Sequence, residues 1–282
     1  MIDTSFLALL DRFSLIIKKK ITSNYVGSRA STSYGSGLIF KDYRDYVMGD
    51  DIRAIDWNIY ARTEELFVKR FEEERNITIK IIVDASASMN FGEKIKKFEY
   101  ASMIGLGFTH MALKNNERFE FSTFAEQLVT YRAKKGKSQL LAILSYLNST
   151  TAKGKSNFKR SLEEYRKTVS SRSMIVLISD FLFDLQELKD ILYRYKKTEV
   201  YVVQVLDPIE RNLEIYGDLL LKDSESNDML RTFLSHRLKE KIKEKLNAHI
   251  FEIQEICGET NSKFISVTTD TSIFDTFYGI LK

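Results

Sequence analysis

The sequence predicts a doubly wound α/β fold with a mostly parallel sheet. From residue 77 onward, short apolar runs alternate with amphipathic stretches of helical period. Strands that alternate with helices form parallel sheets with helices on both faces. The first largely apolar run, Ile79 to Val83, leads directly into Asp84-Ala85-Ser86-Ala87-Ser88. Such sheets bind ligands at the carboxyl ends of their strands, so this junction is the first place to expect a site.

The periodicity assigns each later segment to a strand or a helix. We expect strands at residues 77–83, 118–124, 127–132, 174–179, 199–206 and 264–267, with a short strand at 217–221. We expect helices at residues 94–113, 138–147, 158–169, 185–195, 227–256 and 272–281. The long helix over 227–256 would place Leu230, Leu234, Leu238 and Ile242 on one face.

Two parts are expected in the chain: an N-terminal helix with a β-rich charged extension over residues 1–75, and the α/β domain over residues 76–282. Apolar residues between positions 6 and 17 repeat with helical period, and three lysines follow at 18–20. We expect this helix to dock on the body, with contact to a membrane surface as the alternative. Residues 21–40 are rich in Ser, Gly and Thr, which favours an extended arm.

Charged and aromatic residues are densely interleaved between positions 40 and 75. We expect a partly buried ionic network around Trp57, with a solvated surface as the alternative. Arg44, Arg53 and Arg62 would pair there with acidic residues, which are Asp50, Asp51, Asp56 and the glutamates at 72–74. Because removal of one partner of a buried pair is costly, we expect replacement of Arg53 by Ala to lower the melting temperature.

Composition excludes several classes of protein. With 282 residues and 44% hydrophobic residues, the chain can bury a substantial core. The net charge of +4 is a small difference between 43 basic and 39 acidic residues, so no nucleic-acid partner is expected. Cys257 is the only cysteine, which excludes an internal disulfide and a cysteine-based zinc site. No apolar run is long enough to span a membrane, and we expect a cytoplasmic protein.

Three oxygen-rich segments are expected at the same edge of the sheet. They contribute two carboxylates and three hydroxyls, from Asp84, Ser86, Ser88, Ser156 and Asp180. Hard oxygen ligands of this kind suit Mg²⁺ or Mn²⁺ rather than zinc or copper. The alternative is that Ser86 and Ser88 only cap the turn that follows the strand, by accepting hydrogen bonds from backbone N–H groups.

These residues resemble a known pattern. Asp-x-Ser-x-Ser after the first sheet strand, a hydroxyl in a glycine-containing loop and an Asp after a later strand resemble the metal-ion-dependent adhesion site of von Willebrand factor A domains. The upstream segments 40–46, 49–57, 61–62 and 69–75 are similar to the signature of a prokaryotic von Willebrand A-like family known as domain of unknown function fifty-eight. The resemblance implies a Rossmann-type sheet.

The resemblance also implies roles for the site residues. Ser86, Ser88 and Ser156 would bind Mg²⁺ through their hydroxyls, Ser156 standing where threonine is more usual, and Asp84 and Asp180 would hold it directly or through water. An acidic side chain of a partner protein would complete the shell. The implied partner is a MoxR-type AAA+ ATPase, with this chain as a non-catalytic adaptor in chaperone-like maturation of other complexes.

Enzymatic functions are weaker alternatives. A metal-dependent phosphatase or other hydrolase could use Asp84 as nucleophile, but Ser86 stands where such enzymes need a second acid. A phosphate-binding loop ending at Ser156 would need glycine at position 149, which is Ser149. The three histidines have no metal-ligand spacing.

Overall fold

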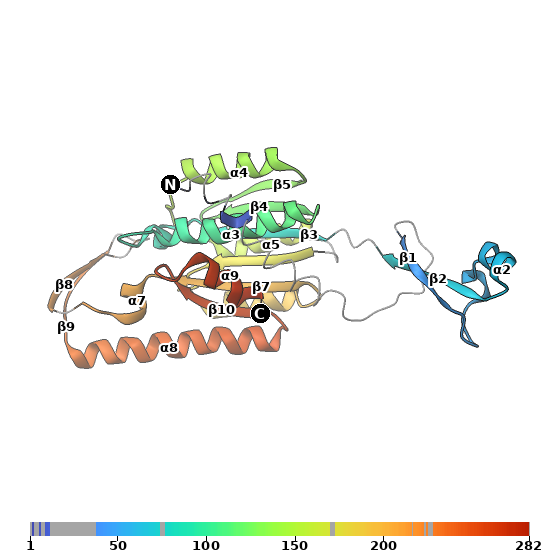
Figure 1. The fold of residues 1–282 in the computed structure, drawn as a ribbon. Helices are drawn as coiled ribbons and strands as arrows, with labels where there is room; N and C mark the ends of the chain where they lie inside the picture. The colour runs from blue at the N-terminus through green and yellow to red at the C-terminus, as the bar shows by residue number, and fades with distance from the viewer. Residues whose placement is uncertain are drawn as a thin grey trace. The chain divides into compact units, whose positions relative to one another are not determined.

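The structure is a computed structural model that describes residues 2, 6, 9–11, 38–73, 77–169, 173–215, 217–222, 224 and 228–281 (Figure 1). Two compact units divide the chain: Met1–Ile21 together with Ile77–Lys282, and Thr22–Asn76. The expected arm up to residue 37 and most of the expected N-terminal helix lie outside the described residues.

A mostly parallel sheet forms the centre of the first unit, as the sequence predicts. Within the described residues it has six strands in the order β10-β7-β6-β3-β4-β5. Their bounds are β3 (Thr78–Asp84), β4 (Arg118–Phe124), β5 (Leu128–Lys134), β6 (Ser173–Ser179), β7 (Glu199–Leu206) and β10 (Lys263–Thr268). The edge strand β5 pairs antiparallel to β4, and the other pairs are parallel.

Helices cover both faces of this sheet because its central strands are apolar on both sides. Ile81 and Val83 of β3 belong to one buried core and Ile82 to another, as the two-residue period of a strand requires. The first core includes α3 (Lys97–Lys114), α4 (Lys137–Ser149) and α9 (Ile273–Leu281), and the second includes α5 (Phe158–Tyr165), α6 (Leu185–Arg194) and α8 (His236–Glu259). None of the helices in the described chain is both long and apolar enough to cross a membrane.

The strand order reverses between β3 and β6. From β3 the chain passes through α3 to β4 on one side, and later enters β6 on the other side of β3. The two strands are in parallel register, with Val83 opposite Ile178, so their carboxyl ends lie side by side. Ligands of open α/β sheets bind at such a switch point. The topology therefore brings the ends of β3 and β6 together at the expected location of a site.

The prediction of one helix over 227–256 is wrong at its start. Residues Met229–Leu234 form strand β9, which pairs antiparallel with β8 (Gly217–Lys222). Helix α8 begins only at His236, where the Ser235 side chain accepts a hydrogen bond from the backbone N–H of Leu238 at 3.3 Å. Leucines four residues apart fit a helix, but antiparallel pairing with β8, the preceding strand, decides the conformation here.

The described N-terminal residues belong to the α/β unit. Ile2, Phe6 and Leu10 are buried in the same core as α3 and α4. Asp11 accepts from Lys114 Nζ at 2.6 Å. These residues therefore group with residues 77–282. The boundary expected from the sequence, after residue 75, had placed them in the extension.

The extension is a small hairpin unit with an ionic network. Strands β1 (Leu38–Asp45) and β2 (Phe67–Glu73) pair antiparallel, and η1 (Ile52–Ala54) and α2 (Trp57–Thr63) lie between them. Asp56 is the centre of the network: it accepts hydrogen bonds from Lys69 Nζ at 3.1 Å, Tyr43 Oη at 3.0 Å and Asn58 N at 3.0 Å. Elsewhere in the unit, Arg44 contacts Asp50 at 2.6 Å.

Two expectations for this network are wrong. Trp57 is 55% exposed, because it opens a helix none of whose residues is buried. The Arg53 side chain is 88% exposed, and its ion-pair partner among the described residues is the nearby Asp51, at 3.7 Å. An exposed pair of this kind contributes little to stability, so Arg53 is not a partner in a buried ion pair.

We predict that Asp56→Ala destabilises the extension and that Arg53→Ala does not. Loss of Asp56 removes the helix cap and leaves Lys69 and Tyr43 without their shared acceptor. Trp57 is the only tryptophan of the chain, so its fluorescence in a denaturant titration reports unfolding of this unit. A lower midpoint for Arg53→Ala, or an unchanged midpoint for Asp56→Ala, would contradict this assignment.

Candidate functional site

The candidate site is built at the carboxyl ends of β3 and β6. Asp84 is the last residue of β3, and Asp180 follows the last residue of β6. Both carboxylates are buried. The turn after β3 forms a short helix, η2 (Ala87–Asn90), with Ser86 at its N-cap position. The parallel register thus brings together two predicted site residues that lie 96 positions apart in the sequence.

Asp84 is fully buried and is held by neutral donors. Its Oδ1 accepts from the backbone N–H of Ser86 at 2.8 Å, and its Oδ2 accepts from Ser179 Oγ at 2.7 Å. Burial and the nearby charge of Asp180 raise the pKa of Asp84 to about 7, although the hydrogen bonds from Ser179 and Ser86 act against this rise. In the described chain, Asp84 therefore lacks a cationic partner that would offset its burial.

Ser86 and Ser88 lie close together, and Ser86 does not cap the turn. The two Oγ atoms are 3.1 Å apart. The Ser86 side chain makes no capping hydrogen bond to η2, so the capping alternative does not account for this residue. Adjacent ligands of an octahedral Mg²⁺ ion are about 2.9 Å apart, given Mg–O distances near 2.1 Å. The spacing of the two hydroxyls is compatible with adjacent positions around one such ion.

The loop that carries Ser156 runs beside this turn. The backbone N–H of Ala87 donates to the carbonyl of Gly154 at 2.9 Å, and the N–H of Lys153 donates to the carbonyl of Ala85 at 2.9 Å. Gly154 has φ +81°, and a Cβ there would lie 2.8 Å from Glu126 Oε1, so the loop requires glycine. The hydroxyl oxygen of Ser156 is shielded from solvent. The structure therefore brings the third predicted segment next to the first.

Asp180 differs from Asp84 because it has a cationic partner. Its Oδ2 accepts from Lys97 Nζ at 2.9 Å, and its Oδ1 accepts from the backbone N–H of Leu182 at 3.2 Å. Lys97 is completely buried and donates a second hydrogen bond to Glu210 Oε1 at 2.8 Å. Burial lowers the pKa of Lys97, but the charges of Asp180 and Glu210 outweigh this effect and raise it. The ammonium therefore remains charged inside the site.

Sequence reasoning missed Lys97 and Glu210. Lys97 is the first residue of α3, where the helix dipole disfavours a cation. A lysine at the start of the helix that follows the Asp84–Ser88 turn was thus a signal that its ammonium has a role in the site. Glu210 lies in α7 (Pro208–Asn212), where it also completes a capping box by accepting from the backbone N–H of Asp207 at 2.9 Å. Its pairing with Lys97 depends on contacts between distant segments.

The donor set suits a hard cation better at Asp84 than at Asp180. The described residues contain no group of three or more His, Cys, Asp or Glu side chains that could hold a metal. A site here would instead combine carboxylate and hydroxyl oxygens, which suit Mg²⁺ or Mn²⁺. Asp84, Ser86 and Ser88 provide such oxygens, whereas the Asp180 carboxylate is already engaged by Lys97. The metal assignment of the five residues stays a prediction.

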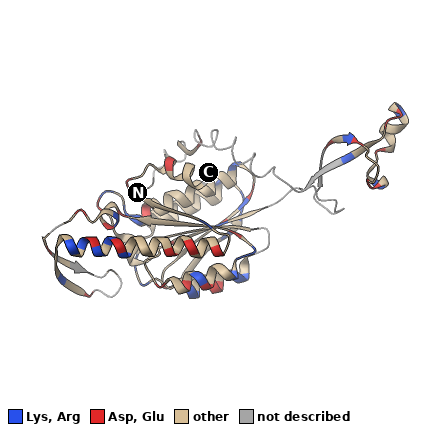
Figure 2. Ribbon diagram, turned by 90° about the horizontal axis from the view of Figure 1, so that it is seen from below, with Lys and Arg blue, Asp and Glu red and all other residues tan. Residues whose placement is uncertain are grey.

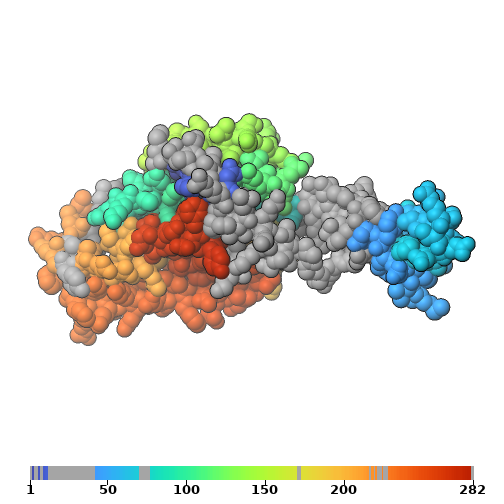
Figure 3. All heavy atoms as spheres, in the orientation of Figure 1, coloured from blue at the N-terminus to red at the C-terminus, as the bar shows by residue number. Residues whose placement is uncertain are grey.

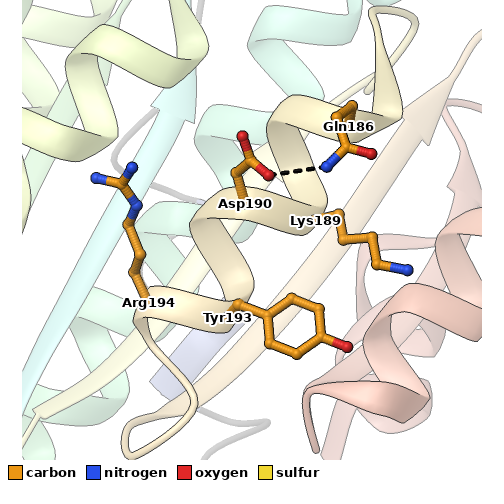
Figure 4. Close-up of a pocket in the computed structure, with 5 residues that line it drawn as sticks. All are labelled: Gln186, Lys189, Asp190, Tyr193 and Arg194. Carbon is orange, nitrogen blue, oxygen red and sulfur yellow. Dashed lines mark hydrogen bonds between the residues drawn. The ribbon is translucent and has the colours of Figure 1, made fainter.

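A shallow hollow on α6 lies apart from these residues. It is lined by Gln186, Lys189, Asp190, Tyr193 and Arg194 (Figure 4). Its charges are paired: Lys159 contacts Asp190 at 2.8 Å, Lys189 contacts Glu259 at 3.1 Å and Arg194 contacts Glu163 at 3.0 Å. This arrangement is typical of a solvated helix surface, so we assign it no site.

Comparison with known proteins gives a family match over most of the chain. The family described as "Protein of unknown function DUF58" matches residues 42–251. Two uncharacterized proteins, Rv1480 of Mycobacterium tuberculosis (strain H37Rv) and Mb1516 of Mycobacterium bovis, are each 24% identical over 273 residues, covering 95% of this chain and 86% of theirs.

Solved structures show a distant similarity. The conserved hypothetical protein BatB from Bacteroides thetaiotaomicron aligns with a TM-score of 0.45 and 15% identity, over 73% of this chain and 97% of that one. An aerotolerance-related membrane protein from Bacteroides fragilis NCTC 9343 aligns with a TM-score of 0.44 and 16% identity, over 73% of this chain and 98% of that one.

We predict that Lys97→Met lowers the free energy of unfolding by about 3–5 kcal/mol at neutral pH, because the buried Asp180 and the half-buried Glu210 are left without their cation. Burial already raises the pKa of Glu210, and loss of Lys97 would remove a charge that lowers it. The folded variant would then bind more protons than the unfolded one, so its deficit should shrink as the pH falls.

Denaturant titrations of Lys97→Met and wild type at several pH values would measure this deficit. Lys80→Met is the matched control for the loss of a buried lysine outside the site. Lys80 forms another buried ion pair, with Glu120 on the neighbouring strand, at 2.6 Å. An equally stable Lys97→Met at neutral pH would contradict the role assigned to the ammonium.

Proposed function

The chain belongs to the DUF58 family of proteins of unknown function, and we propose that it is a non-catalytic protein-binding module that depends on a divalent cation. The cation, Mg²⁺ or Mn²⁺, would be held by Asp84, Ser86 and Ser88, with Ser156 and Asp180 completing the site directly or through water. When bound, it would offer an open coordination position to an acidic side chain of a partner protein.

The carboxylate of Asp84 carries this proposal. It is fully buried beside Asp180, and its hydrogen-bond donors, Ser86 N and Ser179 Oγ, are neutral. An ionised carboxylate in such a place costs free energy unless a cation offsets it. Asp180 has its cation in Lys97, whereas no cation contacts Asp84 among the described residues. A divalent ion bound by Asp84 and the two neighbouring hydroxyls would provide the missing charge.

We further propose a von Willebrand A-like fold for the α/β unit. The strand order and the three converging loops support it. For the partner we propose a MoxR-type AAA+ ATPase, with this chain as its adaptor in the maturation of other protein complexes. This part of the proposal depends on the resemblance of the sequence motifs alone.

We expect Mg²⁺ or Mn²⁺ to raise the melting temperature of the wild-type chain, since a ligand that binds only the folded state stabilises it. Asp84→Asn and the double variant Ser86→Ala/Ser88→Ala should lose this response. Ser102→Ala, which removes a buried hydroxyl elsewhere on α3, should keep it. Thermal unfolding with and without EDTA measures the effect. The same melting temperature in metal and in EDTA for the wild type would remove the basis of the proposal.

The pH dependence of metal-free protein should show the cost of ionising Asp84. Its pKa of about 7 lies above the ordinary value of 3.8, so the folded state favours the protonated form. Stability is then lost as the pH rises from about 4 through about 7, and the loss levels off above that. Asp84→Asn lacks this loss and should become the more stable form at pH 8. Denaturant titrations in EDTA across this range would test the sign.

Binding to the ATPase is tested by pull-down. Wild-type chain in Mg²⁺ should capture a purified MoxR-type ATPase from the same genome, whereas EDTA or Asp84→Ala should prevent capture. Incubation of the wild type with a generic phosphomonoester addresses the phosphatase alternative. Metal-dependent phosphate release that Asp84→Ala abolishes would favour that alternative over a binding role.

A further inference from the structure

Asp180 has two roles that conflict. It belongs to the proposed cation site, and it is also an ion-pair partner of Lys97, whose Nζ donates to its Oδ2 at 2.9 Å. Its Oδ1 accepts from the backbone N–H of Leu182 at 3.2 Å. A divalent cation beside the same carboxylate would repel the ammonium, so simultaneous contact with both is unfavourable. Binding of such an ion at Asp180 therefore requires that the ammonium move away.

The backbone around Asp180 is held in place by three hydrogen bonds. The side-chain amide of Gln204, which is fully buried in β7, donates to the carbonyl of Asp180 at 2.9 Å. The next carbonyl, that of Phe181, lies 2.7 Å from His249 Nε2 on α8, and the Phe181 N–H donates to Ser179 Oγ at 3.0 Å. A lysine side chain, in contrast, is a flexible four-carbon stem. The ammonium is therefore the partner that can move.

Glu210 gives the ammonium a second acceptor. Its Oε1 accepts from Lys97 Nζ at 2.8 Å, while its Oε2 accepts from the backbone N–H of Asp207 at 2.9 Å. The Glu210 side chain is 24% exposed, against 4% for that of Asp180. The start of α3 and α7, which carry Lys97 and Glu210, adjoin at the surface of the first unit (Figure 3). Release from Asp180 would therefore leave the ammonium paired.

Lys97 acts on these carboxylates from inside the fold. Basic and acidic residues are interspersed on the surface helix α8 (Figure 2), where water and salt screen their charges. Lys97 is completely buried, so its charge is screened much less. Burial and, to a smaller extent, the charge of Asp180 raise the pKa of both Asp84 and Glu210. Asp180 thus links Asp84 electrostatically to the pair of Lys97 and Glu210.

We propose that the Lys97 ammonium is a built-in competitor for the cation of the site: without metal it bridges Asp180 and Glu210, and when Mg²⁺ or Mn²⁺ is bound it contacts Glu210 alone. Asp180 is then free to join Asp84 in holding the ion. This inference rests on the proposed function, because it concerns the affinity and regulation of the same cation site. The competition lowers the affinity for the cation, since like charges repel, and couples binding to α7 through Glu210.

Opposite effects of two substitutions distinguish this competition from a purely structural role. Lys97→Met removes the repelling charge and frees Asp180, so it should tighten cation binding although it destabilises the fold. Glu210→Gln removes the carboxylate to which the ammonium withdraws, so it should weaken binding. The amide oxygen of glutamine can still accept from the Asp207 backbone N–H, which preserves the start of α7. If Lys97 only held the segments together, both substitutions would loosen the site and weaken binding.

Titration of the full chain with Mn²⁺ tests the proposal, with the free ion followed by its electron paramagnetic resonance signal. Relative to wild type, the dissociation constant should fall about tenfold or more in Lys97→Met and rise about threefold or more in Glu210→Gln. Lys96→Met is the matched control, because it removes the neighbouring exposed lysine, whose Nζ donates to Asn90 at 2.6 Å. It should change the constant by less than about twofold.

A double variant shows whether Glu210 acts through Lys97. In the Lys97→Met background there is no ammonium to accept, so Glu210→Gln should change the dissociation constant by less than about twofold. Thermal unfolding separates stability from affinity. Without metal, Lys97→Met should melt at a lower temperature than wild type, yet its melting temperature should rise more when Mn²⁺ is added.

The outcomes separate this inference from the proposed function. Equal or weaker Mn²⁺ binding by Lys97→Met, with binding by wild type, would overturn the competition and leave the proposed cation site intact. Absence of binding by wild type and Lys97→Met alike would overturn both proposals. If Lys97→Met does not fold, Glu210→Gln decides, and binding as tight as that of wild type would overturn the competition.

Discussion

The buried ammonium of Lys97 is the interaction on which the candidate site depends. It joins the start of α3, the end of β6 and α7 through Asp180 and Glu210. Each of these groups would be costly to bury alone, and their mutual contacts offset that cost. Since the carboxylates approach from two different segments, the ammonium also determines how these segments meet at the sheet edge. Lys97 therefore has a structural role as well as an electrostatic one.

This arrangement makes the two aspartates unequal. Asp180 is neutralised from within the fold, while Asp84, at the end of the adjacent strand, is surrounded by hydroxyl and N–H donors. Lys97 is the cation of Asp180 and Glu210, and in the described chain no cation contacts Asp84, so the charge of Asp84 is left to be compensated. Ser86 and Ser88, with their hydroxyl oxygens 3.1 Å apart, lie next to the uncompensated one. The proposed cation site follows from this imbalance more than from the motif itself.

The surface of the chain suggests that binding is not confined to the sheet edge. In the described part of the extension, few apolar residues are buried, and Trp57 and Met48 are 55% and 96% exposed. The β8–β9 hairpin of the α/β unit exposes Leu220, Met229, Leu230 and Phe233 beside the ion pair of Arg231 and Asp218. Single exposed apolar residues are ordinary, whereas a group of them on one element indicates a contact surface.

Local patterns in the sequence determined the sheet strands, most helices and the positions of Asp84, Ser86, Ser88 and Asp180, because burial on both faces produces apolar runs and strand ends recruit polar residues. Only the tertiary structure decided that 229–234 pair as a strand, that Arg53 and Trp57 face solvent, and that Lys97 and Glu210 enter the site. The entry of Lys97 and Glu210 into the site depends on contacts between segments far apart in sequence, and the strand at 229–234 depends on its pairing with β8. Periodicity carries no information on either.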